Sequence, residues 1–251
     1  MSSDNTGRTA VVTGASKGIG AGIAKALAES GAAVVVNYRT DAEGAERVVA
    51  EITAKGGRAL AVRADVAKGE EEVRELFARA RAAYGAVDIL VNNAGVVAFG
   101  PLTELTEEEF HRATTTNMLA PMLTTKALAA QEDVTAASVV NVSTGGTLSH
   151  PAYASLYVAT KSALEAYTII AAKELGPRGI RVNAVQPGAS DTEGTRAAGY
   201  VGSELEARAI AATPLGRSGT PGDYGPLVAF LASEDARWIT GALVLASGGS
   251  R

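Results

Sequence analysis

Short apolar runs alternate with longer stretches of mixed polarity along most of the chain. Several of the short runs consist almost entirely of Val, Ile, Leu and Ala, as expected of strands whose two faces are both covered. The runs predicted to form strands cover residues 9–12, 33–37, 59–63, 89–92, 138–142, 181–185 and 242–246.

Between these runs lie amphipathic stretches with apolar residues at helical spacing. They predict helices over 19–30, 42–55, 69–84, 106–115, 156–175 and 221–232. Gly31 and Gly85 directly follow two of them, and glycine is a common helix terminator. The alternation predicts an α/β fold, a single domain over 1–251 with a doubly wound parallel sheet of about seven strands and helices on both faces. Residues 187–215 are the least regular stretch and a candidate lid.

Composition narrows the class of protein. The 251 residues include 23 basic and 27 acidic side chains, a net charge of −4, and no cysteine. A disulfide scaffold and a thiolate metal site are therefore excluded, and the acidic balance disfavours nucleic acid as a partner. The chain shows no signal-peptide pattern, no membrane-spanning run and no metal-ligand spacing such as H-x-x-x-H, so we expect a cytoplasmic protein without metal or membrane partner.

The clearest motif follows the first predicted strand. Residues 13–20 read TGASKGIG, with glycines at Gly14, Gly18 and Gly20. A strand, a glycine-rich turn and a helix in this order let a pyrophosphate approach the backbone and face the helix N-terminus. We therefore expect a dinucleotide site here, and a tight turn without a ligand is the plain alternative.

The same loop also matches the G-x-S-x-G pattern of a hydrolase nucleophile elbow, at residues 14–18. An elbow so early in the chain would leave no earlier strands and no oxyanion loop before it. The chain has two histidines, His111 and His150, which leaves few choices for a catalytic triad. A serine hydrolase is therefore disfavoured.

The end of the second strand favours one of the two nicotinamide dinucleotides. NAD-binding chains place an acidic residue about 20 residues beyond the glycine loop, where it holds the ribose 2′-hydroxyl. Here that region carries Tyr38 and Arg39, and no carboxylate precedes Asp41. Arg39 and Lys17 would supply positive charge to a 2′-phosphate, which favours NADP(H) over NAD(H). The alternative is that both are ordinary solvated charges.

Six motifs in order resemble those of the short-chain dehydrogenase/reductases of the compact single-domain type, over nearly the whole chain. Residues 13–20 are similar to TGxxxGxG, 92–95 to NNAG, 157–161 to YxxxK and 187–192 to PGxxxT, and Asp65-Val66 and Asn117 match two further positions. The resemblance implies a Rossmann-type fold and an NADP(H)- or NAD(H)-dependent oxidoreductase. It implies cofactor contacts by Gly14, Ser16, Lys17, Gly18, Ile19, Gly20, Tyr38, Arg39, Asp65, Val66, Asn93, Ala94, Gly95, Pro187, Gly188, Ser190 and Thr192.

The YxxxK spacing has a physical basis. Tyr157 and Lys161 stand four residues apart, so both face the same side of a helix. A free tyrosine has a pKa near 10, and a neighbouring ammonium favours the phenolate and lowers that pKa. Tyr157 can then exchange a proton with a carbonyl or an alcohol. The resemblance further implies that Lys161 binds the nicotinamide ribose and that Asn117 holds a water in a proton relay; a structural amide is the alternative for Asn117.

The sequence departs from the family pattern at the residue that usually supplies a serine. Thr144 lies 13 positions before Tyr157, and Ser143 directly precedes it. Neighbours on a strand point to opposite faces, so Thr144 is the expected donor to the substrate oxygen. Its methyl group stiffens the side chain and narrows the site. The alternative is that the loop is shifted and that Ser143 is the donor.

The substrate is a small or medium carbonyl compound, or the corresponding alcohol, in our interpretation. Two segments, 145–153 and 187–215, provide the candidate substrate contacts. These are Gly145, His150, Tyr153, Arg196 and Tyr200. Alternatives within the family are a 3-oxoacyl-carrier-protein reductase and a sugar dehydrogenase. Residues 129–137 contain acids and no cation, which weakens the carrier-protein alternative.

Two expectations concern the assembly and a non-enzymatic alternative. A dinucleotide-binding protein without activity would keep the glycine loop but lose Tyr157 or Lys161, and both are present. The resemblance implies a homotetramer, with helices near 117–131 and 156–175 at one interface and the apolar segment 238–245 near another.

Overall fold

Seven parallel strands form the centre of the computed structural model, which describes residues 3–250. They occur in the order β3-β2-β1-β4-β5-β6-β7, and every neighbouring pair is parallel. The predicted doubly wound sheet is confirmed, with strand ends displaced by at most two residues. The strands are β1 (Thr9–Val12), β2 (Ala33–Tyr38), β3 (Arg58–Arg63), β4 (Ile89–Asn92), β5 (Ala137–Val142), β6 (Ile180–Pro187) and β7 (Leu243–Ala246).

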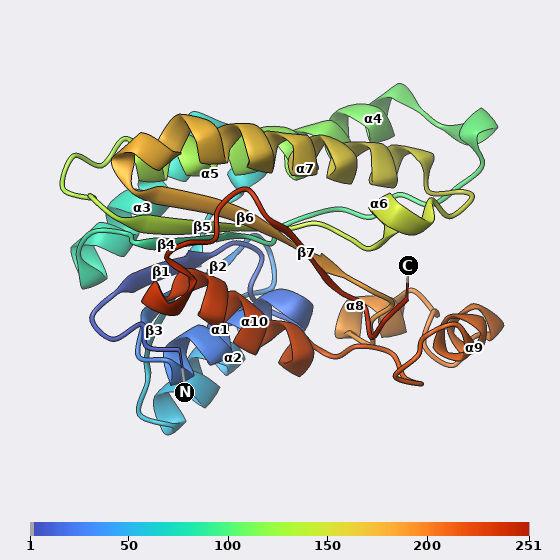
Figure 1. Ribbon diagram of the computed structural model, residues 1–251, viewed down its shortest axis with the longest axis horizontal. Coiled ribbons are helices and arrows are strands. Elements are labelled where there is room, and N and C mark those ends of the chain that lie inside the picture. Colours follow the sequence, from blue (N-terminus) through green and yellow to red (C-terminus); the bar gives the residue numbers. More distant parts are fainter. Residues whose placement is uncertain (1–2, 251) are drawn as a thin grey trace.

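Helices cover both faces of this sheet (Figure 1). One face carries α1 (Gly18–Glu29), α2 (Ala42–Ala54) and α10 (Pro221–Ala232), and the other carries α3 (Glu70–Tyr84), α4 (Glu107–Thr114), α5 (Ala120–Ala129) and α7 (Ser155–Leu175). Each face has its own apolar core, with Leu27 of α1 in the first and Leu128 of α5 in the second fully buried. Burial on both sides explains why the strands read as nearly unbroken apolar runs.

The order of the strands creates a crevice at one edge of the sheet. From β1 the chain winds outward to β2 and β3, and α3 then returns it to the other side of β1 as β4. The helices that follow β1 and β4 therefore lie on opposite faces of the sheet. This reversal point is where open α/β sheets bind ligands.

The two helices expected over 106–115 and near 117–131 form one irregular helical run. A π-helical turn, Thr115–Leu119, joins α4 to α5. Pro121 lies in the first turn of α5 and lacks the N–H that would bond the Asn117 carbonyl four residues earlier. Such turns widen a helix locally and often occur at functional sites.

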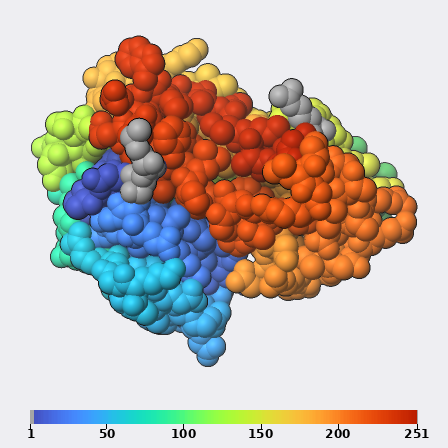
Figure 2. Space-filling view, turned by 60° about the horizontal axis from the view of Figure 1, so that its bottom comes forward, coloured from blue at the N-terminus to red at the C-terminus, as the bar shows by residue number. Residues whose placement is uncertain are grey.

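The segment 187–215 is more regular than predicted. It contains two short helices, α8 (Glu193–Ala197) and α9 (Glu204–Ala211), because the Thr192 and Ser203 side chains each accept a bond from a first-turn N–H. A further short helix, α6 (Gly146–Ser149), follows β5. Figure 2 shows this segment (orange) beside the C-terminal strand region (red), where the Leu215 N–H donates to the Gly248 carbonyl at 3.1 Å.

Short 3₁₀ turns complete the elements at Val66–Lys68, Leu102–Glu104, Gly176–Arg178 and Glu234–Ala236. Within residues 3–250, no helix is long and apolar enough to cross a bilayer.

Candidate active site

The glycine loop between β1 and α1 has a backbone that other residues would not adopt. Gly14 and Gly18 have φ values of +60° and +59°, in the left-handed region. A Cβ on Gly20 would lie 2.4 Å from the Asn93 Nδ2 atom and 2.7 Å from the Gly14 carbonyl oxygen. The loop is therefore folded tightly against the end of β4, and glycine is required at each of these positions.

The residues after β4 hold the glycine loop in place. Asn93 donates from Nδ2 to the carbonyls of Thr13 and Gly14, at 2.9 Å each. The Thr13 hydroxyl in turn accepts from the backbone N–H groups of Asn93 and Ala94, at 3.0 Å each. These bonds span the reversal point between β1 and β4, so the NNAG segment positions the loop and leaves the open face of the crevice to a ligand.

An anion already lies at the N-terminus of α1. The Glu193 carboxylate accepts from the Gly18 N–H at 2.9 Å, and a Cβ on Gly18 would lie 3.7 Å from the Thr192 Cβ. Helix N-termini attract negative charge because their first N–H groups have no partner within the helix. The geometry fits a dinucleotide pyrophosphate, with Ser16 and Ile19 half-buried in the same turn.

Of the residues expected at the adenosine end, Lys17 lies in the glycine loop before α1, and the others lie at the carboxyl ends of β2 and β3. Lys17 and Arg39 are exposed, and neither forms an ion pair among the described residues. Asp65 accepts the Ala67 N–H at 3.1 Å and so opens a 3₁₀ turn, while Val66 is buried. Tyr38 is half-buried at the end of β2.

Lys161 is the most unusual charged residue of the site. Its side chain is only 4% exposed, and its Nζ donates to the Val142 carbonyl at 2.7 Å. Burial lowers the Lys161 pKa to about 8, and the negative charge of Glu165 partly opposes this shift. A Cβ on Gly95 would lie 3.4 Å from the same Nζ, so the NNAG segment closes over the ammonium.

Tyr157 stands one helical turn before Lys161, whose Nζ lies 6.0 Å from the centre of the tyrosine ring. The expected lowering of the Tyr157 pKa by the Lys161 ammonium is wrong for this structure, because burial raises the Tyr157 pKa and only the hydrogen bond with the Thr144 hydroxyl opposes the rise. The Phe99 ring packs edge-on against the Tyr157 ring, with 5.9 Å between the ring centres. The structure thus brings together Tyr157, Lys161 and Thr144 at the crevice.

Ser143 and Thr144 have different partners. The Ser143 hydroxyl donates to the Glu165 carboxylate at 2.6 Å and is buried. The Thr144 hydroxyl is half-buried, faces Tyr157 and accepts from the Gly146 N–H at 3.2 Å. The geometry favours Thr144 as the residue that can meet a substrate oxygen.

The Asn117 side chain is fully engaged. Its amide pairs with the backbone of Val96, receiving the N–H at 2.8 Å and donating to the carbonyl at 2.9 Å. It also donates to the Thr160 hydroxyl at 3.0 Å. The amide therefore fastens the π-helical turn to the NNAG segment and to α7.

The loop after β6 closes the other side of the crevice. The Pro187 carbonyl accepts from the Gly145 N–H at 2.7 Å, which couples this loop to the one carrying Thr144. A Cβ on Gly188 would lie 2.8 Å from the Ser247 Cα, so glycine is needed there. The Ser190 hydroxyl bonds the Gly188 carbonyl and the Tyr224 hydroxyl, at 2.8 and 2.6 Å, so it braces the loop.

The expected substrate residues lie on two segments, one after β5 and one after β6. His150 and Tyr153 are exposed and have positive φ values of +47° and +66°, which is a strained backbone for both. Arg196 pairs with Asp191 at 2.7 Å, and this pairing leaves it less free to bind a substrate than an unpaired arginine. Tyr200 follows Arg196 by four residues and is half-buried.

Sequence reasoning missed two residues of the site. Phe99 follows the NNAG segment and is 67% exposed although its ring contacts Tyr157, and it forms an apolar lip with Tyr153, which lines the same small pocket. Glu165 is a buried acid one turn after Lys161. An acid on the buried face of a helix was the signal that could have identified it.

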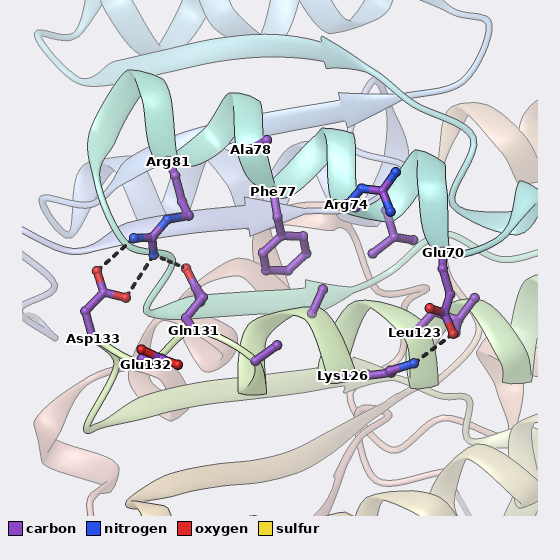
Figure 3. A pocket seen from close by; sticks show the side chains of 13 residues that line it. Glu70, Arg74, Phe77, Ala78, Arg81, Leu123, Lys126, Gln131, Glu132 and Asp133 are labelled. Atoms are coloured by element: carbon purple, nitrogen blue, oxygen red, sulfur yellow. Dashed lines mark hydrogen bonds and ion pairs between the residues drawn. The ribbon is translucent and has the colours of Figure 1, made fainter.

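A large groove lies away from these residues. A groove of about 670 Å³ runs between α3 and α5, with Phe77 pointing into it (Figure 3). Ion pairs close its two ends, Arg81 with Asp133 at 2.9 Å and Lys126 with Glu70 at 2.8 Å. None of the expected site residues lines this groove. Within residues 3–250, no cluster of His, Asp and Glu suited to a metal ion occurs.

The fold, the glycine loop and the Tyr157–Lys161 pair define a nicotinamide-dependent oxidoreductase. Comparison with known proteins agrees: the family model described as enoyl-(acyl carrier protein) reductase matches residues 14–251. The chain belongs to the short-chain dehydrogenase/reductase family.

Three similar proteins cover almost the whole chain. An uncharacterized oxidoreductase of Methylorubrum extorquens is 51% identical over 98% of both chains. The 3-oxoacyl-[acyl-carrier-protein] reductase FabG of Staphylococcus epidermidis is 39% identical over 96% of this chain and 98% of its own. The structure of the landomycin C-6 ketoreductase LanV, with bound NADP and rabelomycin, has a TM-score of 0.87 and 40% identity, covering 99% of this chain and 98% of that one.

The close contact at Gly20 generates a prediction. Gly20→Ala should destabilise the protein by about 1–3 kcal/mol and weaken dinucleotide binding, because the added methyl group must displace Asn93. Gly176→Ala is the control, since a Cβ there meets nothing within 4 Å. Thermal unfolding and fluorescence titration with NADPH measure both effects. Wild-type stability and affinity in Gly20→Ala would contradict the tight loop described here.

Proposed function

We propose that this protein is an NADPH-dependent carbonyl reductase in which Tyr157 donates the proton. The observation that carries the proposal is the convergence of Tyr157, the buried Lys161 and Thr144 at the carboxyl edge of the sheet, beside the glycine loop. Reduction is reversible, so the same residues serve oxidation of the alcohol. Residues 1–251 act as one NADP(H)-binding domain in this proposal.

Each residue has a distinct task. When bound, NADPH supplies the hydride to the carbonyl carbon. Tyr157 gives its phenolic proton to the carbonyl oxygen, which Thr144 holds by a hydrogen bond. The Lys161 ammonium stabilises the resulting phenolate by its charge. The Asn117 carbonyl holds a water through which a solvent proton returns to Tyr157.

The cofactor is held by groups from separate loops in this proposal. Backbone N–H groups of the glycine loop bind the pyrophosphate, and Thr192 lies close enough to Gly18 to assist. Asp65 accepts from the adenine, and Lys17 and Arg39 bind the 2′-phosphate. The NADP bound in the LanV structure supports the choice of NADP(H).

The substrate class follows from the lip of the site. Phe99 is exposed beside Tyr157, and the small pocket at Phe99 is lined by Tyr153, Leu102 and Leu105 together with Glu104 and Glu109. Exposed aromatic and aliphatic side chains gain free energy by covering apolar substrate surface. The proposed substrate is therefore an apolar ketone of small or medium size. A 3-oxoacyl thioester is the second candidate, supported by the likeness to FabG.

The proton-transfer role predicts a sharp loss of activity. Tyr157→Phe should lower kcat by about 10²–10⁴-fold, because the proton donor is lost while the ring that packs on Phe99 remains. The dissociation constant for NADPH should stay within about twofold of wild type. Absorbance at 340 nm with a panel of cyclic ketones, fused-ring ketones, sugars and an acetoacetyl thioester measures turnover. Undiminished turnover by Tyr157→Phe would remove Tyr157 from this role.

The cofactor preference predicts a selective loss. Arg39→Ala should weaken NADPH binding by roughly 10–100-fold, the size expected for loss of a charged hydrogen bond. Binding of NADH, which has no 2′-phosphate, should change little. Arg79→Ala, which removes an exposed arginine of α3, is the control. Equal losses for the two dinucleotides would contradict a phosphate contact by Arg39.

The assembly is proposed to be a homotetramer. Ile169 and Ile170 are exposed on α7, Leu119 is exposed just before α5, and Trp238 is 96% exposed near the C-terminus. Exposed apolar residues on adjoining helices are typical of a surface that another subunit covers. The partner proposed here is a second copy of this chain.

This assembly predicts a mutational effect. Ile170→Glu should shift the protein from tetramer toward smaller species, because a charge would be buried at the α7 interface. Light scattering coupled to size-exclusion chromatography measures the mass. Ala50→Glu, on the exposed side of α2, is the control and should leave the mass unchanged. A monomeric wild-type protein would contradict the proposal.

A further inference from the structure

Glu165 is a buried carboxylate that forms no ion pair within residues 3–250. It lies on α7, is 8% exposed, and its Oε1 accepts three hydrogen bonds. The donors are the Ser143 hydroxyl at 2.6 Å, the Thr147 hydroxyl at 2.8 Å and the Gln186 amide at 2.9 Å. Burying a carboxylate is costly, and neutral donors offset only part of that cost. A residue kept under these conditions calls for a function beyond packing.

The three donors come from the segments that build the site. Ser143 directly precedes Thr144 at the end of β5, and Thr147 lies in α6 of the same loop. Gln186 lies at the end of β6, immediately before the Pro187-Gly188 turn, and also donates to the Thr147 hydroxyl at 3.0 Å. One carboxylate oxygen therefore ties α7 to both loops that close the crevice.

Glu165 also acts on Lys161 through its charge. The two residues are one turn apart on α7, and the Glu165 charge raises the Lys161 pKa against the effect of burial. Tyr157 is the other titratable group facing Lys161 in the described chain. The remaining neighbours are neutral, namely the Val142 carbonyl from β5 and the NNAG segment at Gly95. Around Glu165 itself, the loop after β5, α6 and β6 contribute the three neutral donors, and no salt bridge to its carboxylate occurs within residues 3–250.

We propose that Glu165 is a positioning residue of the active site and that it acts in two ways. Its oxygen holds the loop that presents Thr144, and its charge keeps Lys161 in the ammonium form that Tyr157 needs. The proposal rests on the proposed roles of Tyr157 and Lys161. It adds to them a residue that touches neither substrate nor cofactor.

The two effects are separable by substitution. Glu165→Gln keeps an oxygen that accepts the same bonds but removes the charge. Ser143→Ala removes the bond nearest to Thr144 and keeps the charge. Glu174→Gln is the matched control, because Glu174 is an exposed acid on the same helix. Each variant is assayed for ketone reduction from pH 6 to 10, with NADPH binding and thermal unfolding measured in parallel.

The sign of the pH effect follows from electrostatics. Removing a negative charge lowers the pKa of nearby groups, so Lys161 loses its proton at lower pH in Glu165→Gln. The alkaline limb of kcat/KM, which belongs to the Tyr157–Lys161 pair, should move down by roughly one pH unit. Ser143→Ala should keep the wild-type limb but lower kcat roughly fivefold, with the KM for NADPH unchanged. Glu174→Gln should match wild type in both.

Specific outcomes would overturn the inference. A folded Glu165→Gln that binds NADPH and keeps the wild-type limb would show that the charge does not act on Lys161. A wild-type kcat in Ser143→Ala would show that the carboxylate does not position Thr144. A purely structural role for Glu165 predicts lower unfolding temperatures in both variants with unchanged pH profiles and kcat. Failure of the proposed function is distinguishable, because wild-type turnover would then be absent or unaffected by Tyr157→Phe.

Discussion

The burial of one ammonium group shapes the rest of the site. The side chain of Lys161 extends from α7 toward the end of β5, where its Nζ donates to the Val142 carbonyl at 2.7 Å. Desolvation lowers its pKa to about 8. Because desolvation moves this pKa toward neutral pH, Lys161 holds its proton less firmly than a solvent-exposed lysine does. The charge is strong there because little water screens it. The Val142 carbonyl accepts from this cation, and the negative charge of Glu165 offsets part of the effect of its desolvation.

The sheet explains how residues far apart in sequence meet around this cation. Because all strands are parallel, their carboxyl ends share one edge, and the loops after β1, β4, β5 and β6 converge there. The reversal between β1 and β4 opens the crevice, and Asn93 bridges it by bonding the backbone of Thr13 and Gly14. The rigid sheet thus sets the distances, and the loops supply the chemistry.

The sequence predicted the sheet well because its strands are apolar and end at glycines or polar residues, so strand ends moved by at most two positions. It predicted Tyr157 and Lys161 because residues 157–161 resemble the YxxxK motif of the family, and helical spacing places both residues on one face. It did not predict the partners of Asn117 or Glu165, because Val96, Thr160, Ser143 and Gln186 approach them only in the folded chain. The short helices α8 and α9 were missed because few apolar residues follow their N-caps, Thr192 and Ser203. No periodic apolar pattern therefore marks these helices in the sequence.

The contact between Glu193 and Gly18 joins the segment 187–215 to the glycine loop. A carboxylate at the N-terminus of α1 satisfies an N–H that would otherwise lack a partner, and the proposed pyrophosphate would satisfy it with more charge. The two anions repel each other, so both cannot use that N–H at once. In the proposed binding mode the pyrophosphate therefore takes the place of the Glu193 carboxylate at this N–H, while Thr192, which caps α8, already lies against Gly18.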